Sequence, residues 1–211
     1  MPSCRVIFQS DPLNKQNGIK TLSVDTLSYI RFPTGLFSPS IILSDNIEVA
    51  IELWVSIGQE GVETSPVIVS FASPSPKSNN TLNSFRIQKH PSSNSLAIVL
   101  ESNNSVEILS TTVRYYQQNI IYIAVNIISN KFINLYVNGS LVVDQNFPYD
   151  ISKFDGLNFI GVGLESTDTI IKGFNGEVYE FRVWNGVLSK EKIYQNYFSG
   201  PGNNFIVISI N

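Results

Sequence analysis

Pairs of carboxylates are the first candidates for chemistry, because glycoside hydrolysis needs two of them about 5 to 5.5 Å apart for retention and farther apart for inversion. Glu48 and Glu52 share one face of an expected strand, roughly 13 Å apart along it, which suits neither geometry without a bend. Glu177 and Glu180 have an odd spacing and need a β-bulge to share a face. We expect Glu180 to pair with Arg182 on a surface instead, so the residues favour a non-enzymatic protein.

The only histidine, His90, would have to serve any Ser-His or Cys-His nucleophile. It precedes Pro91 in an expected loop, far along the sequence from the single cysteine, Cys4, and we expect it to face solvent. A closed zinc site takes four ligands from Cys and His, which this chain lacks. These residues therefore favour neither nucleophilic catalysis nor zinc.

Calcium needs hard oxygen ligands gathered from loops. The available acidic and amide residues follow no spaced motif, and Asn and Asp are ordinary turn residues. We expect no cofactor, with calcium as the open alternative, and the oxygen ligands that it could use are Asp45, Asn46, Asp150, Asp155 and Asp168.

Sugar binding combines aromatic rings, which stack on C–H patches, with amides and carboxylates that bind hydroxyl groups. Such side chains occur on the face of the expected strands that lies opposite the core, and at one strand end. The alternative interpretation is that these side chains cover the second face of a sheet or meet another subunit. The candidate ligand-binding residues are Glu52, Trp54, Tyr115, Tyr116, Tyr122, Asn126, Asn134 and Tyr136.

The strands that must position these residues follow from a period of two. From Ile47 to Ile57 every second residue is aliphatic, and the opposite row contains Glu52 and Trp54. Residues 121–127 repeat the pattern. Residues 132–143 contain Asn138-Gly139, two residues that adopt positive φ readily, between alternating runs, which predicts a two-residue type I′ hairpin.

Further short segments complete the expected elements. Ser189 begins a helix of about three turns, with Glu191 in its first turn, Leu188 and Ile193 as a hydrophobic staple, and Gly200-Pro201 at its end. Residues 37–46 and 73–84 are expected to be long loops, which on a rigid sandwich often carry recognition. The terminal run should pair inside a sheet, beside the N-terminal strand. The other expected strands are 5–8, 28–32, 67–71, 84–89, 96–100, 106–109, 157–162 and 205–210.

Composition limits the classes of function. The chain has 211 residues, of which 43% are hydrophobic and 15% charged, which suits one globular domain over residues 1–211. A formal charge of −3 offers no basic field for nucleic acid, and no apolar run is long enough to span a membrane. Residues 1–20 contain no long apolar run, so we expect no secretory signal. A cytoplasmic protein, or one packaged in a particle, is expected, with an extracellular setting left open.

Several ordered motifs resemble the laminin-G-like branch of the concanavalin A-like lectin/glucanase superfamily. They are Leu135-Tyr136-Val137-Asn138-Gly139, Ile160-Gly161, Phe174 with Gly176, Val178, Glu180, Arg182 with Trp184-Asn185, and Leu188-Ser189. The likeness covers roughly residues 21–200. It implies a jelly-roll sandwich that binds carbohydrate or protein ligands, sometimes with calcium. Two departures from the family are a missing Trp near Ile121-Tyr122 and the secretory signal that we expect this chain to lack. The sequence contains neither the acidic cluster of the glucanases nor the galectin signatures.

Together these features predict an all-β, two-sheet antiparallel jelly-roll sandwich with one short helix near the C-terminus. The leading function is a non-enzymatic, lectin-like module that binds a glycan or glycoprotein. The alternative is a structural or assembly protein, a virion or fibre component, that uses the sandwich for protein contacts and forms a homo-oligomer. A polysaccharide-active hydrolase or lyase is the third hypothesis.

Overall fold

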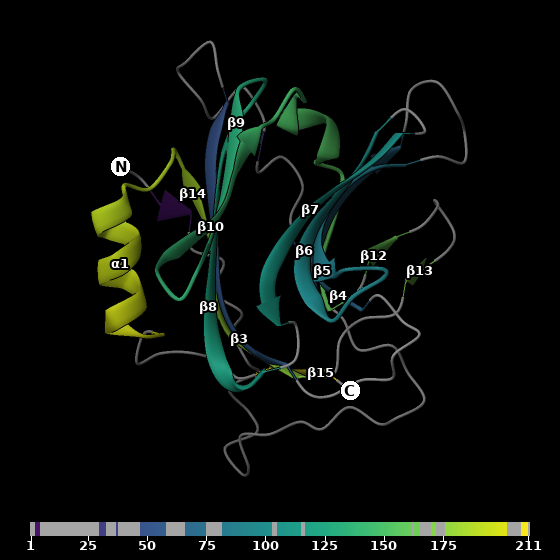
Figure 1. Ribbon diagram of the computed structural model, residues 1–211. Helices are drawn as coiled ribbons and strands as arrows, with labels where there is room; N and C mark the ends of the chain where they lie inside the picture. Colours follow the sequence, from purple (N-terminus) through teal and green to yellow (C-terminus); the bar gives the residue numbers. More distant parts are fainter. Residues whose placement is uncertain are drawn as a thin grey trace, which may run out of the picture.

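A computed structural model gives the architecture of the chain (Figure 1). Two antiparallel sheets face each other, and a single described helix lies on the outer side of the first sheet. This is the predicted jelly-roll sandwich. The residues that the structure describes are 3–4, 30–32, 37, 47–57, 66–74, 82–102, 105–114, 117–161, 163–164, 170–171, 176–201 and 208–210.

The first sheet has the strand order β1-β14-β3-β8-β9-β10, and β15 also pairs with β14. β1 and β15 lie on the same edge of β14, opposite its two ends. The described part of the terminal run, residues 208–210, therefore pairs in a sheet on the same edge as the N-terminal strand, with β14 as its one partner among the described strands. The strands are β1 (Ser3–Cys4), β3 (Glu48–Ile57), β8 (Gln117–Ile128), β9 (Phe132–Val137), β10 (Ser140–Asn146), β14 (Gly176–Asn185) and β15 (Ile208–Ile210).

The second sheet has the order β2-β11-β4-β5-β6-β7, and a two-stranded ribbon, β12-β13, lies on its outer side (Figure 1). A 3₁₀ turn, η2 (Ile151–Phe154), precedes β11. The strands are β2 (Ile30–Phe32), β4 (Val67–Pro74), β5 (Leu82–Lys89), β6 (Ser95–Ser102), β7 (Ser105–Arg114), β11 (Leu157–Ile160), β12 (Gly163–Leu164) and β13 (Ile170–Ile171).

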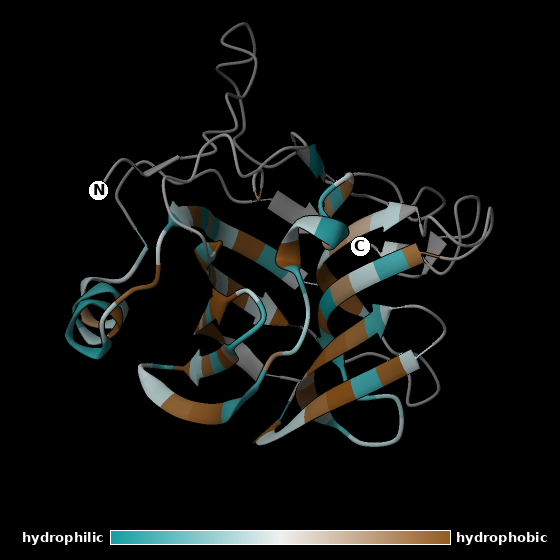
Figure 2. Ribbon diagram, turned by 90° about the horizontal axis from the view of Figure 1, so that it is seen from above, coloured by the Kyte–Doolittle hydropathy of each residue, from teal (hydrophilic) through white to brown (hydrophobic). Residues whose placement is uncertain are grey.

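The core lies between the two sheets. Hydrophobic and hydrophilic residues alternate along the strands (Figure 2), and the odd-numbered aliphatics from Ile47 to Ile57 all enter the core, as predicted. They meet Phe71, Phe85 and Ile98 of the second sheet. Each fully buried side chain of this size contributes about 1.5–3 kcal/mol before the cost in chain entropy, so this row is a major source of stability.

The Asn138-Gly139 hairpin joins β9 to β10 in the predicted way. Asn138 has φ 50° and Gly139 has φ 77°, the positive values that a type I′ turn requires. The Asn138 side chain also accepts a hydrogen bond from the backbone N–H of Tyr122 at 2.9 Å, and its own N–H donates to the Tyr122 carbonyl at 2.8 Å. The turn is therefore fixed against β8 as well as within its own hairpin.

Helix α1 (Lys190–Ser199) also begins and ends at the predicted residues. The Ser189 hydroxyl accepts a hydrogen bond from the Lys192 N–H at 3.2 Å, and Gly200 ends the helix with φ 68°. Leu188 and Ile193 are both buried against the first sheet. Among the residues that the structure describes, no helix is both long and apolar enough to span a lipid bilayer.

Some predicted elements fall outside the described residues. The expected strand at 5–8 lies there, and so do most of the expected loops at 37–46 and 73–84. Of the predicted terminal run at 205–210, residues 208–210 are described. The other predicted strands are present, and several of them, such as β7, extend beyond the bounds expected from the sequence.

Candidate functional site

The outer face of the first sheet, which sequence analysis favoured for ligand binding, lies beneath α1. Leu188 and Ile193 pack there against Trp54, Tyr122 and Tyr136. The Trp54 and Tyr122 rings are 4.7 Å apart at their centroids, and the Tyr197 ring of α1 is 6.1 Å from that of Tyr122. This face is therefore a second, smaller core between the sheet and the helix.

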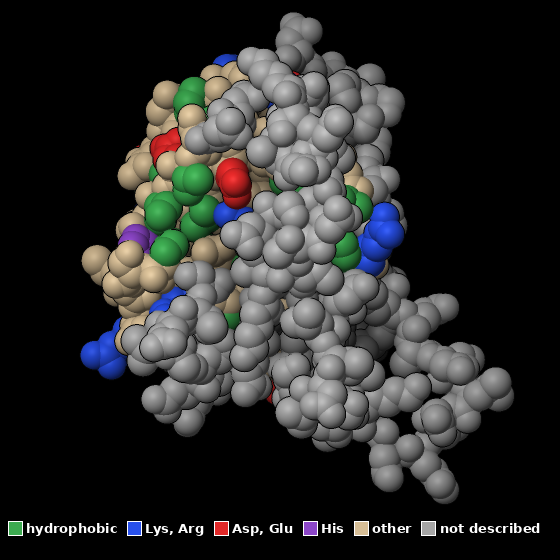
Figure 3. All heavy atoms as spheres, turned by 90° about the vertical axis from the view of Figure 1, so that its right-hand side faces the viewer, with side chains coloured by type: hydrophobic (Ala, Val, Ile, Leu, Met, Phe, Trp, Pro, Cys, Tyr) green, Lys and Arg blue, Asp and Glu red, His purple; other side chains and the backbone are tan. Residues whose placement is uncertain are grey.

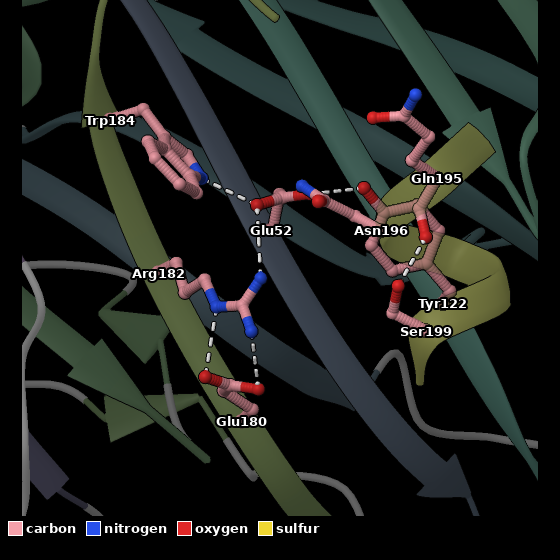
Figure 4. A network of polar contacts seen from close by, with 8 residues as sticks. All are labelled: Glu52, Tyr122, Glu180, Arg182, Trp184, Gln195, Asn196 and Ser199. Carbon is pink, nitrogen blue, oxygen red and sulfur yellow. Dashed lines mark hydrogen bonds and ion pairs between the residues drawn. The ribbon is translucent and has the colours of Figure 1, made fainter. Parts of the chain in front are cut away.

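Glu52 lies at the centre of this second core and is fully buried (Figure 4). Its carboxylate accepts hydrogen bonds from the Tyr122 hydroxyl and the Trp184 indole N–H. The Asn196 side-chain amide of α1 donates to Glu52 Oε1 at 2.8 Å. A buried carboxylate is tolerated when it is paired and hydrogen-bonded, so these donors account for a charge inside the protein.

Arg182 supplies the opposite charge. One guanidinium nitrogen is 3.8 Å from Glu52 Oε2, and two others bind both oxygens of Glu180 at 2.8 Å (Figure 4). The guanidinium also lies over the Trp54 ring, 4.8 Å from its centroid. The predicted pairing of Glu180 with Arg182 is confirmed, although the pair is partly buried.

Asn126 attaches the chain that leads into α1. Its side-chain amide donates to the Leu188 carbonyl at 2.8 Å, and its side-chain oxygen accepts from the Leu188 N–H at 3.0 Å.

Burial raises the pKa of the Tyr122 hydroxyl far above its usual value, and the neighbouring Glu52 charge adds to the rise. The polar groups of this face thus hold α1 in place.

The prediction of an open ligand-binding face is therefore wrong for Glu52, Trp54, Tyr122, Asn126 and Tyr136, which are all buried. The inward face of α1, together with Leu188 just before it, covers them. This contact joins a helix to strands that lie far from it in the sequence.

The other candidates of that set have different positions. Asn134 is only partly buried and donates to Asp144 at 2.7 Å, so ligand contact by Asn134 stays a prediction. Tyr115 and Tyr116 lie outside the described residues.

The candidate catalytic and metal-binding residues are engaged in local structure. A bulge between Val178 and Glu180 interrupts the register of β14, as the sequence suggested, and Glu177 accepts a hydrogen bond from the Tyr179 hydroxyl at 2.7 Å. His90 Nδ1 accepts from the Ser92 N–H at 3.0 Å in a turn, and the residue is partly buried, not exposed as expected.

Two of the candidate calcium ligands, Asp150 and Asp155, support the turn before β11. Asp150 caps η2, and Asp155 accepts hydrogen bonds from the Phe37 N–H and from Asn158. Within the described ranges, no three His, Cys, Asp or Glu side chains gather in a way that could hold a metal ion. Asp45, Asn46 and Asp168 lie outside those ranges.

The outer face of the second sheet carries a different set of residues. On β5, Ser84, Arg86 and Gln88 alternate with the core residues Phe85 and Ile87. Register pairs Arg86 with Val99 of β6, which in turn pairs with Ile108 of β7. In the next row Ser84 pairs with Glu101, which pairs with Val106. These side chains therefore share one face, which points away from the core.

An ion pair and two exposed aliphatic side chains form the part of this face that we call the β5–β7 patch, consisting of Arg86, Glu101, Val106 and Ile108. The Arg86 guanidinium donates to Glu101 Oε2 at 3.1 Å, in a diagonal cross-strand pair. Val106 is 60% exposed and Ile108 is 37% exposed. Figure 3 views the molecule from this side and shows hydrophobic side chains around neighbouring acidic and basic ones.

The β12-β13 ribbon approaches the same face. A Cβ placed on Gly163 of β12 would lie 3.1 Å from Val67 and 3.3 Å from the stem of Arg86. The residue at this position must be small for the ribbon to pack so closely against β4 and β5. The ribbon thus lies against the Arg86 stem, while the charged end of Arg86 binds Glu101.

Sequence analysis missed the β5–β7 patch, although a signal was present. The alternation of Ser84, Arg86 and Gln88 with apolar neighbours predicts one polar face, and Val106 and Ile108 follow the same period. The two signals lie on different strands, and only the register brings Glu101 to Arg86.

The comparisons with known proteins agree with this architecture. A laminin G model of the concanavalin A-like lectin/glucanases superfamily matches residues 26–194. No curated protein sequence matches the chain.

Several solved structures share the fold at low identity. The CBM40 domain of the Ruminococcus gnavus IT-sialidase, bound to α2,3-sialyllactose, is 17% identical with a TM-score of 0.56, covering 79% of this chain and 95% of that one. Domain 4 of AbnA, a GH43 extracellular arabinanase from Geobacillus stearothermophilus in complex with arabinotriose, is 16% identical with a TM-score of 0.54, covering 79% and 71%.

The receptor-binding domain of botulinum neurotoxin mosaic serotype C/D is 15% identical with a TM-score of 0.53, covering 77% of this chain and 38% of that one. The chain thus spans well under half of the length of that toxin domain.

Proposed function

The chain belongs to the concanavalin A-like lectin/glucanases superfamily, and from that premise we propose that it is a non-enzymatic carbohydrate-binding module. Its structural neighbours include a sialidase module bound to sialyllactose and an arabinanase domain in complex with arabinotriose. Others are receptor-binding domains of toxins. Fold alone does not establish activity, so the proposal needs a site in this chain.

We assign the glycan site to the β5–β7 patch. The observation that carries this assignment is the Arg86–Glu101 pair beside the exposed Val106 and Ile108 on an ordered sheet face. The opposite outer face is occupied by α1, and its central carboxylate is already satisfied by protein donors. A sugar on the β5–β7 patch would meet both polar and apolar groups without displacing an element of the fold.

The chemistry of the patch suits a sugar ring. Sugar hydroxyl groups can donate to the Glu101 carboxylate, which the buried Arg86 guanidinium holds in place from behind. Val106 and Ile108 can contact the C–H face of the ring. Because the strands hold these four residues in register before binding, little conformational entropy is lost on association. Tyr115 and Tyr116, which follow β7 in sequence, stay predicted as further contacts.

Glycan-array binding of the intact chain tests the proposal, with two variants as matched probes. Ile108→Lys places a charge on the patch and should weaken glycan binding at least about tenfold. Leu141→Lys makes the same change at an exposed position of the first sheet and should leave binding unchanged. The proposal fails if no glycan binds at high protein concentration, and its site fails if both variants bind like the parent protein.

A second candidate function is self-association through α1. Tyr194 and Phe198 are exposed on the helix, with ring centroids 4.5 Å apart, and Leu141 is exposed on β10. Exposed apolar groups of this kind can mark protein contacts. Light scattering of the parent protein and of Phe198→Ser separates this function from the first, because only an assembly protein would lose mass in the variant.

A further inference from the structure

The two members of the Arg86–Glu101 pair differ in how they face solvent. The Glu101 side chain is 26% exposed and the Arg86 side chain only 7%. One oxygen of Glu101, Oε2, accepts from Arg86 at 3.1 Å. A ligand that approaches the β5–β7 patch therefore meets mainly a carboxylate, whose charge is balanced from behind by the guanidinium.

The other described cations of β5 to β7, Lys89 and Arg114, lie away from the exposed end of the pair. Lys89 lies on β5 at the odd-numbered positions that face the core side, opposite to Arg86, and it is buried. Arg114 lies at the far end of β7, eight residues from Val106, which is roughly 27 Å along a strand. The formal charge of the whole chain is −3. No cation among the described residues of β5 to β7 thus adds to Arg86 at the exposed end of the pair.

From this arrangement we infer that the β5–β7 patch selects neutral sugars over sugars that carry a carboxylate or a sulfate, an inference that rests on the proposed function. A hydroxyl group donates to the Glu101 carboxylate, whereas an anionic group can only be repelled by it. Like charges brought together in an interface oppose binding strongly, and Arg86 is already engaged by Glu101. The patch is therefore built to accept donors.

The experiment measures the affinity of the intact protein for pairs of oligosaccharides that differ only by one carboxylated terminal residue. The neutral member should bind at least about tenfold more tightly. Glu101→Gln removes the exposed charge and leaves the guanidinium uncompensated, so it should reduce this preference by about tenfold or reverse it. Glu48→Gln makes the same change in charge on the first sheet and should leave the ratio unaltered.

The possible results distinguish a wrong sugar preference from a failure of the proposed carbohydrate-binding function. Preference of the parent protein for the carboxylated member overturns the inference while the carbohydrate-binding function holds. An equal preference in Glu101→Gln and in the parent protein also overturns it, because the selectivity would then arise elsewhere. If neither member of any pair binds, the proposed function itself fails, and the inference with it.

Discussion

Replacing Glu52 with alanine tests whether the buried network holds α1 on the first sheet. The substitution removes the acceptor for the Tyr122 hydroxyl and the Asn196 amide, both of which are buried, and for the partly buried Trp184 indole. Each buried donor left without an acceptor costs about 1–3 kcal/mol. Arg182 keeps Glu180 as a partner, so its charge stays paired.

The summed effect should be a loss of about 3–5 kcal/mol in the free energy of unfolding, which is the usual range when one partner of a buried ion pair is removed. For a chain of this size that corresponds to a fall of roughly 10 °C in melting temperature. Urea unfolding at neutral pH measures it, with amide hydrogen exchange to follow α1 directly. Exchange in α1 should rise more than exchange in β5 or β6.

Glu48→Ala is the matched control, because Glu48 lies on the same face of β3, four residues earlier, and is only partly buried. Its effect should stay below about 1 kcal/mol. If Glu52→Ala destabilises the protein no more than Glu48→Ala does, the carboxylate does not hold the helix, and the interpretation of this face as a second core is wrong.

Two further predictions concern the same region. Tyr122→Phe should cost about 1.5–3 kcal/mol at neutral pH through the lost hydrogen bond to Glu52. Burial, and then Glu52, hold the pKa of Tyr122 in the folded protein above its value in the unfolded chain. The stabilisation from Tyr122 is therefore complete below about pH 10 and is lost as the pH rises further. In urea unfolding, the free energies of unfolding of the parent protein and of Tyr122→Phe should converge above that pH by up to about 1.4 kcal/mol per pH unit. Convergence at acidic pH instead would contradict this assignment. Gly139→Ala should cost about 1–2 kcal/mol in stability, since the φ of 77° strains any side chain and the new Cβ would lie 3.2 Å from Tyr197. Thermal unfolding measures this loss beside the control Ser140→Ala, which should be nearly neutral. Equal melting temperatures of the two variants would refute the prediction.

Much of the fold could be predicted because its determinants are local. The alternation from Ile47 to Ile57 depends only on the period of a strand, and the Asn138-Gly139 pair selects its turn by backbone conformation alone. The cap at Ser189 and the stop at Gly200 likewise act within one helical turn. Each of these features needs no knowledge of distant residues.

The burial of the first outer face could not be predicted in the same way, because it depends on which elements of the fold meet. Trp54 and Tyr122 have the composition of a sugar-binding face, and a period of two places them opposite the core as observed. Whether that face is open depends on the docking of α1, about 140 residues farther along the chain than Glu52. Asn196, which completes that contact, gives no signal in the sequence beyond its place in a helix.

The two outer faces of the sandwich differ in what their polar and aromatic residues contact. The first face uses its aromatic and charged residues to attach α1, and Arg182 joins two carboxylates there. The second face keeps the partly exposed Glu101, paired with the buried Arg86, beside exposed aliphatic side chains. We propose recognition at the second face because its exposed groups are held by strands whose core-facing side is fully packed.

Mapping the bound sugar onto the protein tests this account most directly. Backbone amide shifts of isotopically labelled protein, titrated with the neutral oligosaccharide that binds most tightly on the array, identify the face in contact. We predict that the largest shifts lie in β5, β6 and β7, around Arg86, Glu101 and Ile108, while α1 and β3 change little. The account is contradicted if the largest shifts surround Trp54 and Tyr122 beneath α1.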